Sequence, residues 1–577
     1  MFSELLVLAS AALAVALPPH GRAGGEGNRQ HHGPPTYGND GPPTVHLKNG
    51  SYTGVHNSHY NQDFFLGVPF AQPPVEGLRF RNPASLNTTW TGTSEADAYA
   101  SECVGYGGDQ IGYDQSEDCL YLNIIRPAGY EGQALPLAVW IHGGGYYMGG
   151  TADKRYNLSF IVENSVEIGK PIMAASIAYR LGPFGFLNGQ DVEGQGVTNL
   201  GLKDQRLALH WFQENLEAFG GDPTKVTIWG ESAGASSIGR HLTAYNGRDD
   251  HLFRAAIMES GNPIHYTAMN TSSFYQPRYE ALIEATNCST TTDTLDCLRR
   301  VPFEELNSVL NTTQFNTGWT VTVDGDMIAR YGSEQLADGS FVRVPIIDGA
   351  NSDEGTAFSP QNINSEADFA SYLNTTSRVQ QALPPSLVDL LLDAYPDDCC
   401  AGIPSLETLG GVCHLPDPYG YSYRRAAAYF GDEVFIANRR QVCETWAAAG
   451  LTAYCYRFNA IPAGISWPIS VTHFQEVAFV FNNLQGLGYA VNAFEGKGDS
   501  YTQLSELMSK SWASFVADGN VSGWAGRSAD VPDWPKYDVA NPRDLVFDAN
   551  VTSFVELDTY REEGMRLLNE NMIAFRR

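Results

Sequence analysis

A serine flanked by glycines is the first feature of this sequence that could carry out chemistry. In "TIWGESAGASS", Ser232 follows Gly230 by two residues and precedes Gly234 by two residues. Glycine weakens a helix or strand interior by about 0.5–1 kcal/mol, so this spacing favours a sharp turn between two elements. A G-x-S-x-G turn between a strand and a helix exposes the serine hydroxyl. The pattern therefore predicts that Ser232 is a nucleophile.

A serine nucleophile needs a base and an orienting acid, and with this type of turn the chain order is serine, acid, histidine. His473 stands just ahead of an apolar helical run in "SVTHFQEVAFVF", whereas His414 lies in a loop rich in cysteine and proline. The spacing therefore favours His473. In "VPIIDGANSDEGTAF", both Asp353 and Glu354 lie in a loop after an apolar run, and either carboxylate could be the acid.

The negative oxygen of an ester-hydrolysis intermediate needs backbone N–H donors. The residue after the serine, Ala233, is one expected donor, and the glycine-rich stretch "WIHGGGYYMGG" is expected to supply others. Such a stretch can also bind phosphate, but neither a lysine nor G-K-[ST] follows it. A second serine, Ser260 in "MESGN", also follows a strand-like run but lacks the preceding glycine. We interpret Ser260 as a strand-end residue.

The segments that must position these residues alternate between strand and helix patterns. Apolar, β-branched runs that end in glycine or polar turns predict buried strands at 135–142, 171–180, 225–230, 253–260, 342–349 and 451–459. Helical patterns cover 204–221 and the stretch after Ser232. This alternation predicts an α/β fold with a mainly parallel central sheet and helices on both faces. The active site is then expected at the carboxyl ends of the strands.

Composition and the N-terminus indicate a secreted chain. Residues 1–16 carry a short apolar run and an A-x-A site, which predicts a signal peptide rather than a membrane span. Residues 17–44 are rich in Gly, Pro and His and predict a disordered leader, followed by a single domain over 45–577. The net charge of −29 argues against nucleic acid or an anionic membrane as partner. We expect neither a cofactor nor a metal.

Glycosylation and disulfide signals agree with secretion. Asn-X-Ser/Thr sequons, which predict N-linked glycans, occur at Asn49, Asn87, Asn157, Asn270, Asn287, Asn311, Asn374, Asn520 and Asn550. The chain has nine cysteines, which in an oxidising compartment predict disulfides. Because nine is odd, at least one thiol is expected to stay unpaired or to pair elsewhere.

Several longer motifs resemble one family. "EDCLYLNI", "HGGGYY", "AYRLGPFGFL", "LKDQRLALHWFQENLEAFGGDP", "GESAGA", "NSDEGTAF" and "THFQEVAFVF" occur in the order found in the type-B carboxylesterase/lipase family. This family is the cholinesterase-like branch of the α/β-hydrolase fold, and the chain is most similar to its secreted filamentous-fungal members. The resemblance extends from about residue 45 to 575. It implies a serine hydrolase that acts on small-molecule carboxylic esters.

The resemblance also implies roles for individual residues. Glu354 matches the family's acid, His473 matches its base, and the oxyanion donors are Gly144, Gly145 and Ala233. Two disulfides are implied, Cys103–Cys119 and Cys288–Cys297. We further expect Cys413 to pair with Cys400, with Cys399 as the alternative, while Cys443 and Cys455 either pair or stay buried as thiols. The candidates for lining the pocket are Glu231, Tyr146, Tyr147 and Phe474; for the two tyrosines, plain packing is equally expected.

One departure from the family concerns the substrate. The loop from Cys103 to Cys119 holds neither a tryptophan nor an amphipathic helix, features that serve choline binding and lid gating in relatives. We therefore expect an open site for soluble short-chain or aromatic and phenolic esters. The alternatives are a lipase or sterol esterase for long acyl chains and, from another class, a non-catalytic adhesion protein of the same fold. The intact Ser232, Glu354 and His473 disfavour the adhesion protein.

Overall fold

The computed structural model describes residues 41–375 and 382–577. The expected signal peptide over 1–16 and all but the last four residues of the expected leader over 17–44 lie outside the described residues. The first element is a short strand, β1 (Thr44–His46), which pairs with β2 (Ser51–Thr53).

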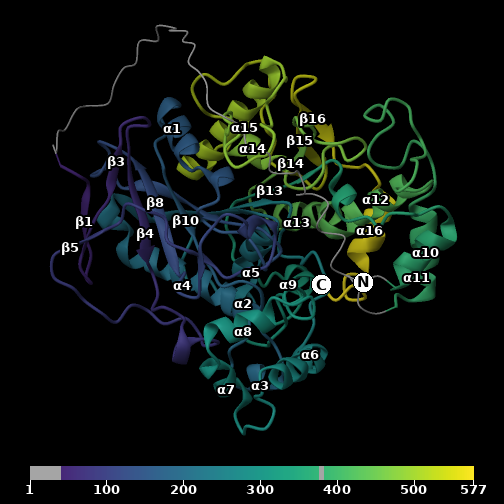
Figure 1. Ribbon diagram of the computed structural model, residues 1–577. Helices are drawn as coiled ribbons and strands as arrows, with labels where there is room; N and C mark the ends of the chain where they lie inside the picture. Colours follow the sequence, from purple (N-terminus) through teal and green to yellow (C-terminus); the bar gives the residue numbers. More distant parts are fainter. Residues whose placement is uncertain (1–40, 376–381) are drawn as a thin grey trace, which may run out of the picture.

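A central sheet of eleven strands runs through the described part of the chain (Figure 1). Its order is β16-β15-β14-β13-β12-β11-β9-β10-β8-β4-β3, and all neighbours from β15 to β10 are parallel. The pairs at the two edges are antiparallel. The parallel strands are β9 (Leu135–Ile141), β10 (Met173–Ile177), β11 (Gly221–Glu231), β12 (Ala255–Glu259), β13 (Ile346–Asn351), β14 (Ala453–Phe458) and β15 (Arg543–Phe547). The antiparallel strands are β3 (Val55–Asn57), β4 (Gln62–Pro69), β8 (Tyr121–Pro127) and β16 (Phe554–Leu557).

Each of the six predicted runs overlaps one of these strands, and the prediction of a mainly parallel α/β fold is confirmed. The central strands are apolar on both faces because each face is covered by helices. In β9, Val139 and Ile141 point into one core while Trp140 points into the other. The sequence shows this as a continuous apolar run rather than as an alternation.

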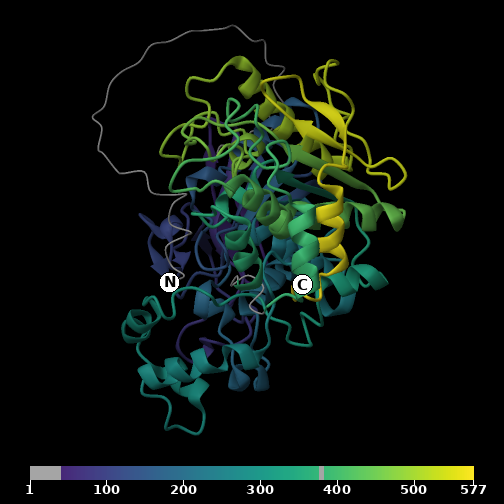
Figure 2. The same ribbon diagram turned by 90° about the vertical axis from the view of Figure 1, so that its right-hand side faces the viewer.

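Helices form layers on the two faces of the sheet (Figure 1). One core includes residues of α4 (Leu200–Asn215), α5 (Ala233–Gly247) and α13 (Ala437–Ala448), and the opposite core includes residues of α1 (Ser159–Glu167) and α15 (Asp499–Asp518). A third core gathers α10 (Glu366–Thr375), α11 (Pro385–Ala394), α12 (Tyr423–Gly431) and α16 (Glu562–Glu570). Figures 1 and 2 place α6 (Ser272–Ala285) and α7 (Thr294–Arg300), in teal, at the end of the molecule away from α15.

Four disulfides use eight of the nine cysteines. Two join Cys103 to Cys119 and Cys288 to Cys297. The expected pair of Cys400 with Cys413 is wrong, because Cys413 is bonded to Cys399 and Cys400 is an exposed thiol. The reason lies in Arg424, whose Nη1 donates to the carbonyl oxygens of both Cys399 and Cys413, at 3.0 and 3.3 Å. These bonds hold the backbones of those two cysteines side by side, with their Cα atoms 5.1 Å apart.

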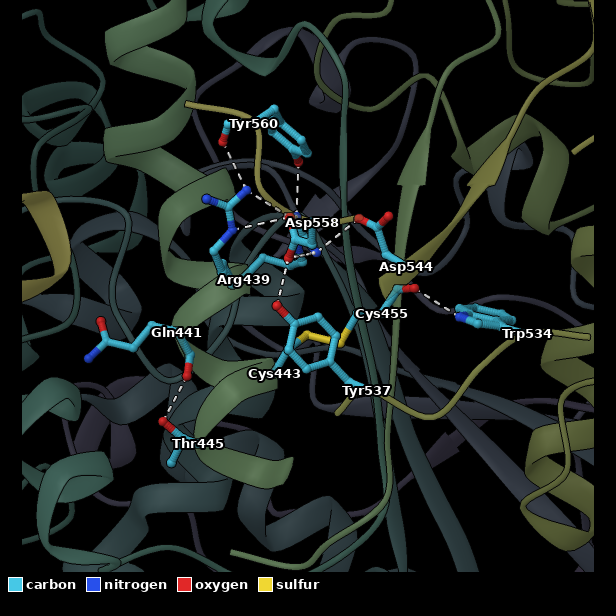
Figure 3. Close-up of a disulfide and its surroundings, with 11 residues drawn as sticks. Arg439, Gln441, Cys443, Thr445, Cys455, Trp534, Tyr537, Asp544, Asp558 and Tyr560 are labelled. Atoms are coloured by element: carbon cyan, nitrogen blue, oxygen red, sulfur yellow. Dashed lines mark hydrogen bonds and ion pairs between the residues drawn. A yellow bond between two sulfur atoms is a disulfide. The ribbon is translucent and has the colours of Figure 1, made fainter. Parts of the chain in front are cut away.

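The fourth disulfide, Cys443–Cys455, ties α13 to β14 inside the protein, beside a buried ion network (Figure 3). Arg439 donates to Asp544 at 3.1 Å and to Asp558 at 2.8 and 2.9 Å. The hydroxyl of Tyr537 also donates to Asp558, at 2.9 Å. Burial alone would raise the pKa of Asp558. The positive charges of Arg439 and Arg440 outweigh burial, so the pKa of Asp558 is lowered. The network therefore anchors α13 to the C-terminal strands.

The structure also bears on glycosylation. Asn270 is only 2% exposed, and its side-chain oxygen accepts a hydrogen bond from Arg576 at 2.7 Å. A glycan needs a surface asparagine, so Asn270 is a wrong candidate in the folded protein. Asn87, Asn287, Asn311, Asn520 and Asn550 are exposed, while Asn49 and Asn157 are partly exposed. The side chain of Asn374 lies outside what the structure describes.

In the described ranges, no helix combines the length and apolar character that crossing a membrane requires.

Candidate active site

Ser232 lies in a one-residue turn between β11, which ends at Glu231, and α5, which begins at Ala233. Its backbone has φ 55° and ψ −122°, which is strained for a residue with a side chain. The flanking glycines allow the turn to pack against β9: a Cβ on Gly230 would stand 2.6 Å from the Ile141 carbonyl oxygen, and one on Gly234 would overlap it. The spacing seen in the sequence thus serves a close backbone approach.

The structure brings Ser232, His473 and Glu354 together. His473 Nε2 lies 2.9 Å from Ser232 Oγ, and His473 Nδ1 lies 2.8 Å from Glu354 Oε2. Glu354 starts a 3₁₀ turn (Glu354–Ala357) just after β13, and Ser232 follows β11, so both occupy carboxyl ends of parallel strands. The contacts run in the order that a nucleophile, a base and an acid would require.

The residues that the spacing left as alternatives have other partners. Asp353 accepts a hydrogen bond from the Val471 N–H at 3.0 Å, and burial raises its pKa to about 7. His414 stacks on Tyr421, with ring centroids 3.5 Å apart. Asp353 thus holds the loop that carries His473, whereas His414 packs within its own loop.

Ser260 has a role that the sequence did not reveal. Its hydroxyl donates to Glu354 Oε1, and the same oxygen accepts from the Asn351 N–H at 2.9 Å. Ser260 does follow the end of β12, as interpreted, with φ 53°. Because β12 is the sheet neighbour of β13, this strand end faces the turn that carries Glu354. Only the strand order, which the sequence does not display, could have indicated the contact.

The glycine-rich loop packs directly on the turn of Ser232. A Cβ on Gly143 would stand 3.1 Å from the Ser232 Cβ. Gly144 and Gly145 have φ 93° and 62°, and the Gly144 carbonyl accepts from the N–H groups of Tyr147 and Met148, both at 3.1 Å. The three predicted oxyanion donors, Gly144, Gly145 and Ala233, thus come from two backbone turns that meet at the serine.

Further carboxyl groups lie buried behind His473. Glu231 Oε1 is 3.2 Å from His473 Nε2, and burial, followed by the charges of Glu476, Glu354 and Glu259, raises the pKa of Glu231 well above its usual value. Burial and the charge of Glu354 raise the pKa of Glu476 to about 7. Raised pKa values favour the neutral acid form at Glu231 and Glu476. No motif or spacing in the sequence singles out Glu259 or Glu476.

The remaining pocket candidates differ in exposure. Tyr146 is fully buried and packs on Phe186, with ring centroids 4.9 Å apart, which favours the packing alternative for Tyr146. Tyr147 and Phe474 are partly exposed. Phe474 follows His473 in the chain, and the Arg155 guanidinium lies 4.8 Å from the centre of the Phe474 ring.

The first disulfide loop is pinned to its surroundings. The buried Gln110 side chain donates to the Cys103 carbonyl at 3.1 Å and accepts from the Gly149 N–H at 2.6 Å. Asp109 pairs with Arg155 at 2.8 Å, and the Tyr106 N–H donates to the Tyr147 carbonyl at 2.7 Å. The loop's single helical element is the 3₁₀ turn Gly108–Gln110. The first disulfide loop is therefore held against the glycine-rich loop by several contacts.

Comparisons with known proteins agree with this geometry. The family model described as "Carboxylesterase family" matches residues 41–563. The chain is 33% identical over 530 residues to Secreted lipase 1 of Botryotinia fuckeliana, covering 86% of this chain and 87% of that protein. It is 32% identical over 476 residues to Lipase 2 of Geotrichum candidum, covering 73% and 80%. The crystal structure of Aspergillus niger EstA superposes with a TM-score of 0.80 at 26% identity, over 94% of this chain and all of that one.

Proposed function

The chain belongs to the carboxylesterase family and is a carboxylic ester hydrolase, and on this premise we propose that it cleaves soluble short-chain or aromatic esters through Ser232, His473 and Glu354. The observation that carries the proposal is the unbroken hydrogen-bond sequence from Ser232 Oγ through His473 to Glu354, at 2.9 and 2.8 Å. The relative named a secreted lipase supports the further proposal that the protein is secreted. The exposed sequon asparagines support the proposal that it carries N-linked glycans.

The proposed mechanism has two halves. Ser232 Oγ attacks the ester carbonyl while His473 Nε2 takes the hydroxyl proton, and Glu354 stabilises the imidazolium through Nδ1. Backbone N–H groups of Gly144, Gly145 and Ala233 bind the oxyanion. His473 then protonates the leaving alcohol, which gives an acyl-enzyme. Water repeats the sequence at the acyl carbonyl, releases the acid and restores Ser232.

The pinned loop supports a preference for soluble esters. A lid that opens at an interface needs a segment whose contacts are few, whereas Gln110 and Asp109 fasten this loop to the glycine-rich stretch and to Arg155. A second candidate function is hydrolysis of long-chain acyl esters, which is favoured by the relatives named lipases.

The test is hydrolysis of nitrophenyl esters with acyl chains from two to sixteen carbons, with Ser232→Ala as the blank. Highest kcat/KM on short chains and an inactive variant would support the proposal. Highest kcat/KM on long chains would favour the lipase. Equal rates for wild type and variant on every ester would refute the role of Ser232, and an organophosphonate probe that fails to label the wild type would refute it independently.

A further inference from the structure

One helix beside the site changes its geometry for a single turn. The helical segment from Tyr423 to Ala448 is α-helical except over Asp432–Ile436, which forms a π-helical turn. A π-turn costs regular hydrogen bonding and is frequent at functional positions. This turn is entirely buried, so it shapes the interior rather than the surface.

Side chains on both sides hold the π-turn in place. Arg561 donates to both carboxylate oxygens of Asp432, at 2.6 and 2.7 Å, and the Tyr395 hydroxyl donates to Asp432 at 3.0 Å. At the other end, the Asn438 side chain donates to the Val434 carbonyl at 2.8 Å. Hydrogen bonds from Arg561, Tyr395 and Asn438 therefore hold the π-turn at both of its ends.

The π-turn places the ring of Phe435 flat on the ring of His473. The two ring centroids are 4.9 Å apart and the planes are only 8° from parallel. Phe358 approaches the same imidazole edge-on at 5.1 Å, and it also packs on Phe435 at 5.6 Å. Since both imidazole nitrogens are engaged in the ring plane, Phe435 covers one of the two faces that the hydrogen bonds leave open.

The turn that carries Phe435 is also joined to the acid. Gly355, next to Glu354, meets Gly431 at the end of α12 so closely that a Cβ on Gly355 would stand 2.5 Å from the Gly431 N. A backbone contact of this kind allows little sliding between the two elements. The ring of Phe435 and the carboxylate of Glu354 therefore approach His473 from one rigid unit.

We propose that Phe435 is a positioning residue for His473: its stacked ring fixes the imidazole plane and stabilises the imidazolium that forms when Ser232 loses its proton. The aromatic face attracts a cation, so the stack is stronger after proton transfer than before it. The inference rests on the proposed function, because it requires His473 to be the base. The titratable groups that face the imidazole are Glu354, Glu231 and Glu476, and Phe435 acts beside them without carrying charge.

The test compares Phe435→Leu with Phe430→Leu. Phe430 is a matched control because it lies on the same helical segment, is also buried and meets another aromatic ring, that of Tyr429, edge-on with centroids 5.0 Å apart. Loss of the stacked ring makes the imidazolium less stable. In Phe435→Leu, the acid limb of the kcat profile is expected to move to lower pH by about half a unit. The plateau kcat is expected to fall about three- to tenfold, with KM nearly unchanged.

Phe435→Tyr keeps the ring and is expected to restore the wild-type profile. If Phe435→Leu fails to fold, Phe435→Met fills a similar volume without a π-face and takes its place. An acid limb at the wild-type pH in the Leu or Met variant would overturn the inference while leaving the hydrolase proposal intact. If the wild type itself has no Ser232-dependent activity, the proposed function fails and this inference fails with it.

Discussion

Ser260 and Glu354 are joined by a hydrogen bond on the side of the carboxylate that does not face His473. The two residues follow neighbouring parallel strands, β12 and β13, so the sheet itself sets their approach. One oxygen of Glu354 thus contacts His473, and the other contacts the scaffold.

Ser260→Ala is expected to lower kcat about tenfold, because one hydrogen bond to a buried charged group is lost and the carboxylate gains freedom to turn. Ser165→Ala is the control, since Ser165 is also buried but donates to the Val162 carbonyl in α1. Steady-state kinetics on the preferred nitrophenyl ester measures both. Equal losses in the two variants would mean that Ser260 has only a packing role.

Neighbouring acids offer a matched pair. Glu354→Gln is expected to lower kcat by about 10³–10⁴, because the amide no longer stabilises the imidazolium or its tautomer. Asp353→Asn changes the charge one residue earlier, on a side chain bonded to the Val471 N–H, and is expected to be much less harmful. Kinetics at the plateau pH compares them. A larger loss in Asp353→Asn would reverse the assignment of the acid.

Buried carboxyl groups predict that the protein becomes more stable as the solution becomes mildly acidic. Burial raises the pKa of Glu102 to about 8, and burial also raises those of Asp353 and Glu476 to about 7. Between about pH 4 and pH 8 the folded state keeps protons that the unfolded chain has lost, so the free energy of unfolding falls as the pH rises.

Thermal unfolding at pH 5 and pH 8 measures this difference. Glu476→Gln removes one of the titrating groups and is expected to flatten the dependence. A higher Tm at pH 8 than at pH 5 in the wild type would contradict the prediction.

Cys400 is expected to be the thiol that reacts with iodoacetamide in the native, unreduced protein. Fragmentation of the peptide that spans the adjacent cysteines identifies the modified residue by mass spectrometry. Cys400→Ser should abolish the labelling and leave ester hydrolysis unchanged. A label on Cys399 or Cys413 would show that the pairing differs from the one described here.

Arg439→Met is expected to destabilise the protein by about 3–5 kcal/mol, because it leaves Asp544 and Asp558 buried without their shared cation. Chemical denaturation measures the change. Arg566→Met is the control, since its pairs with Glu563 and Glu570 are at the surface, and its denaturation midpoint should stay close to the wild-type value. Equal midpoints for both variants would show that the network in Figure 3 contributes little.

Local patterns predicted the features that depend on neighbouring residues. The turn at Ser232 was predictable because two glycines at this spacing indicate a sharp turn between a strand and a helix, even though the backbone that they approach most closely, at Ile141, is distant in the sequence. The choice of Glu354 over Asp353 followed from resemblance, because two adjacent carboxylates differ only in where the chain turns.

Features that depend on distant segments were not predictable. Predicting the contact of Ser260 would have required the strand order. Choosing between Cys399 and Cys400 as the partner of Cys413 would have required the position of Arg424. The π-turn at Phe435 was not predictable because the apolar spacing of a helix barely changes when one turn widens.

The glycine contact between positions 355 and 431 also constrains how this protein can change. A side chain at either position would push the helix and the acid turn apart, so neither position can accept a larger residue unless the backbone moves. A single substitution at Gly355 or Gly431 is therefore expected to disturb the backbone, so these positions cannot be changed one at a time. A library that diversifies the surroundings of His473 will yield more active members if both glycines are kept.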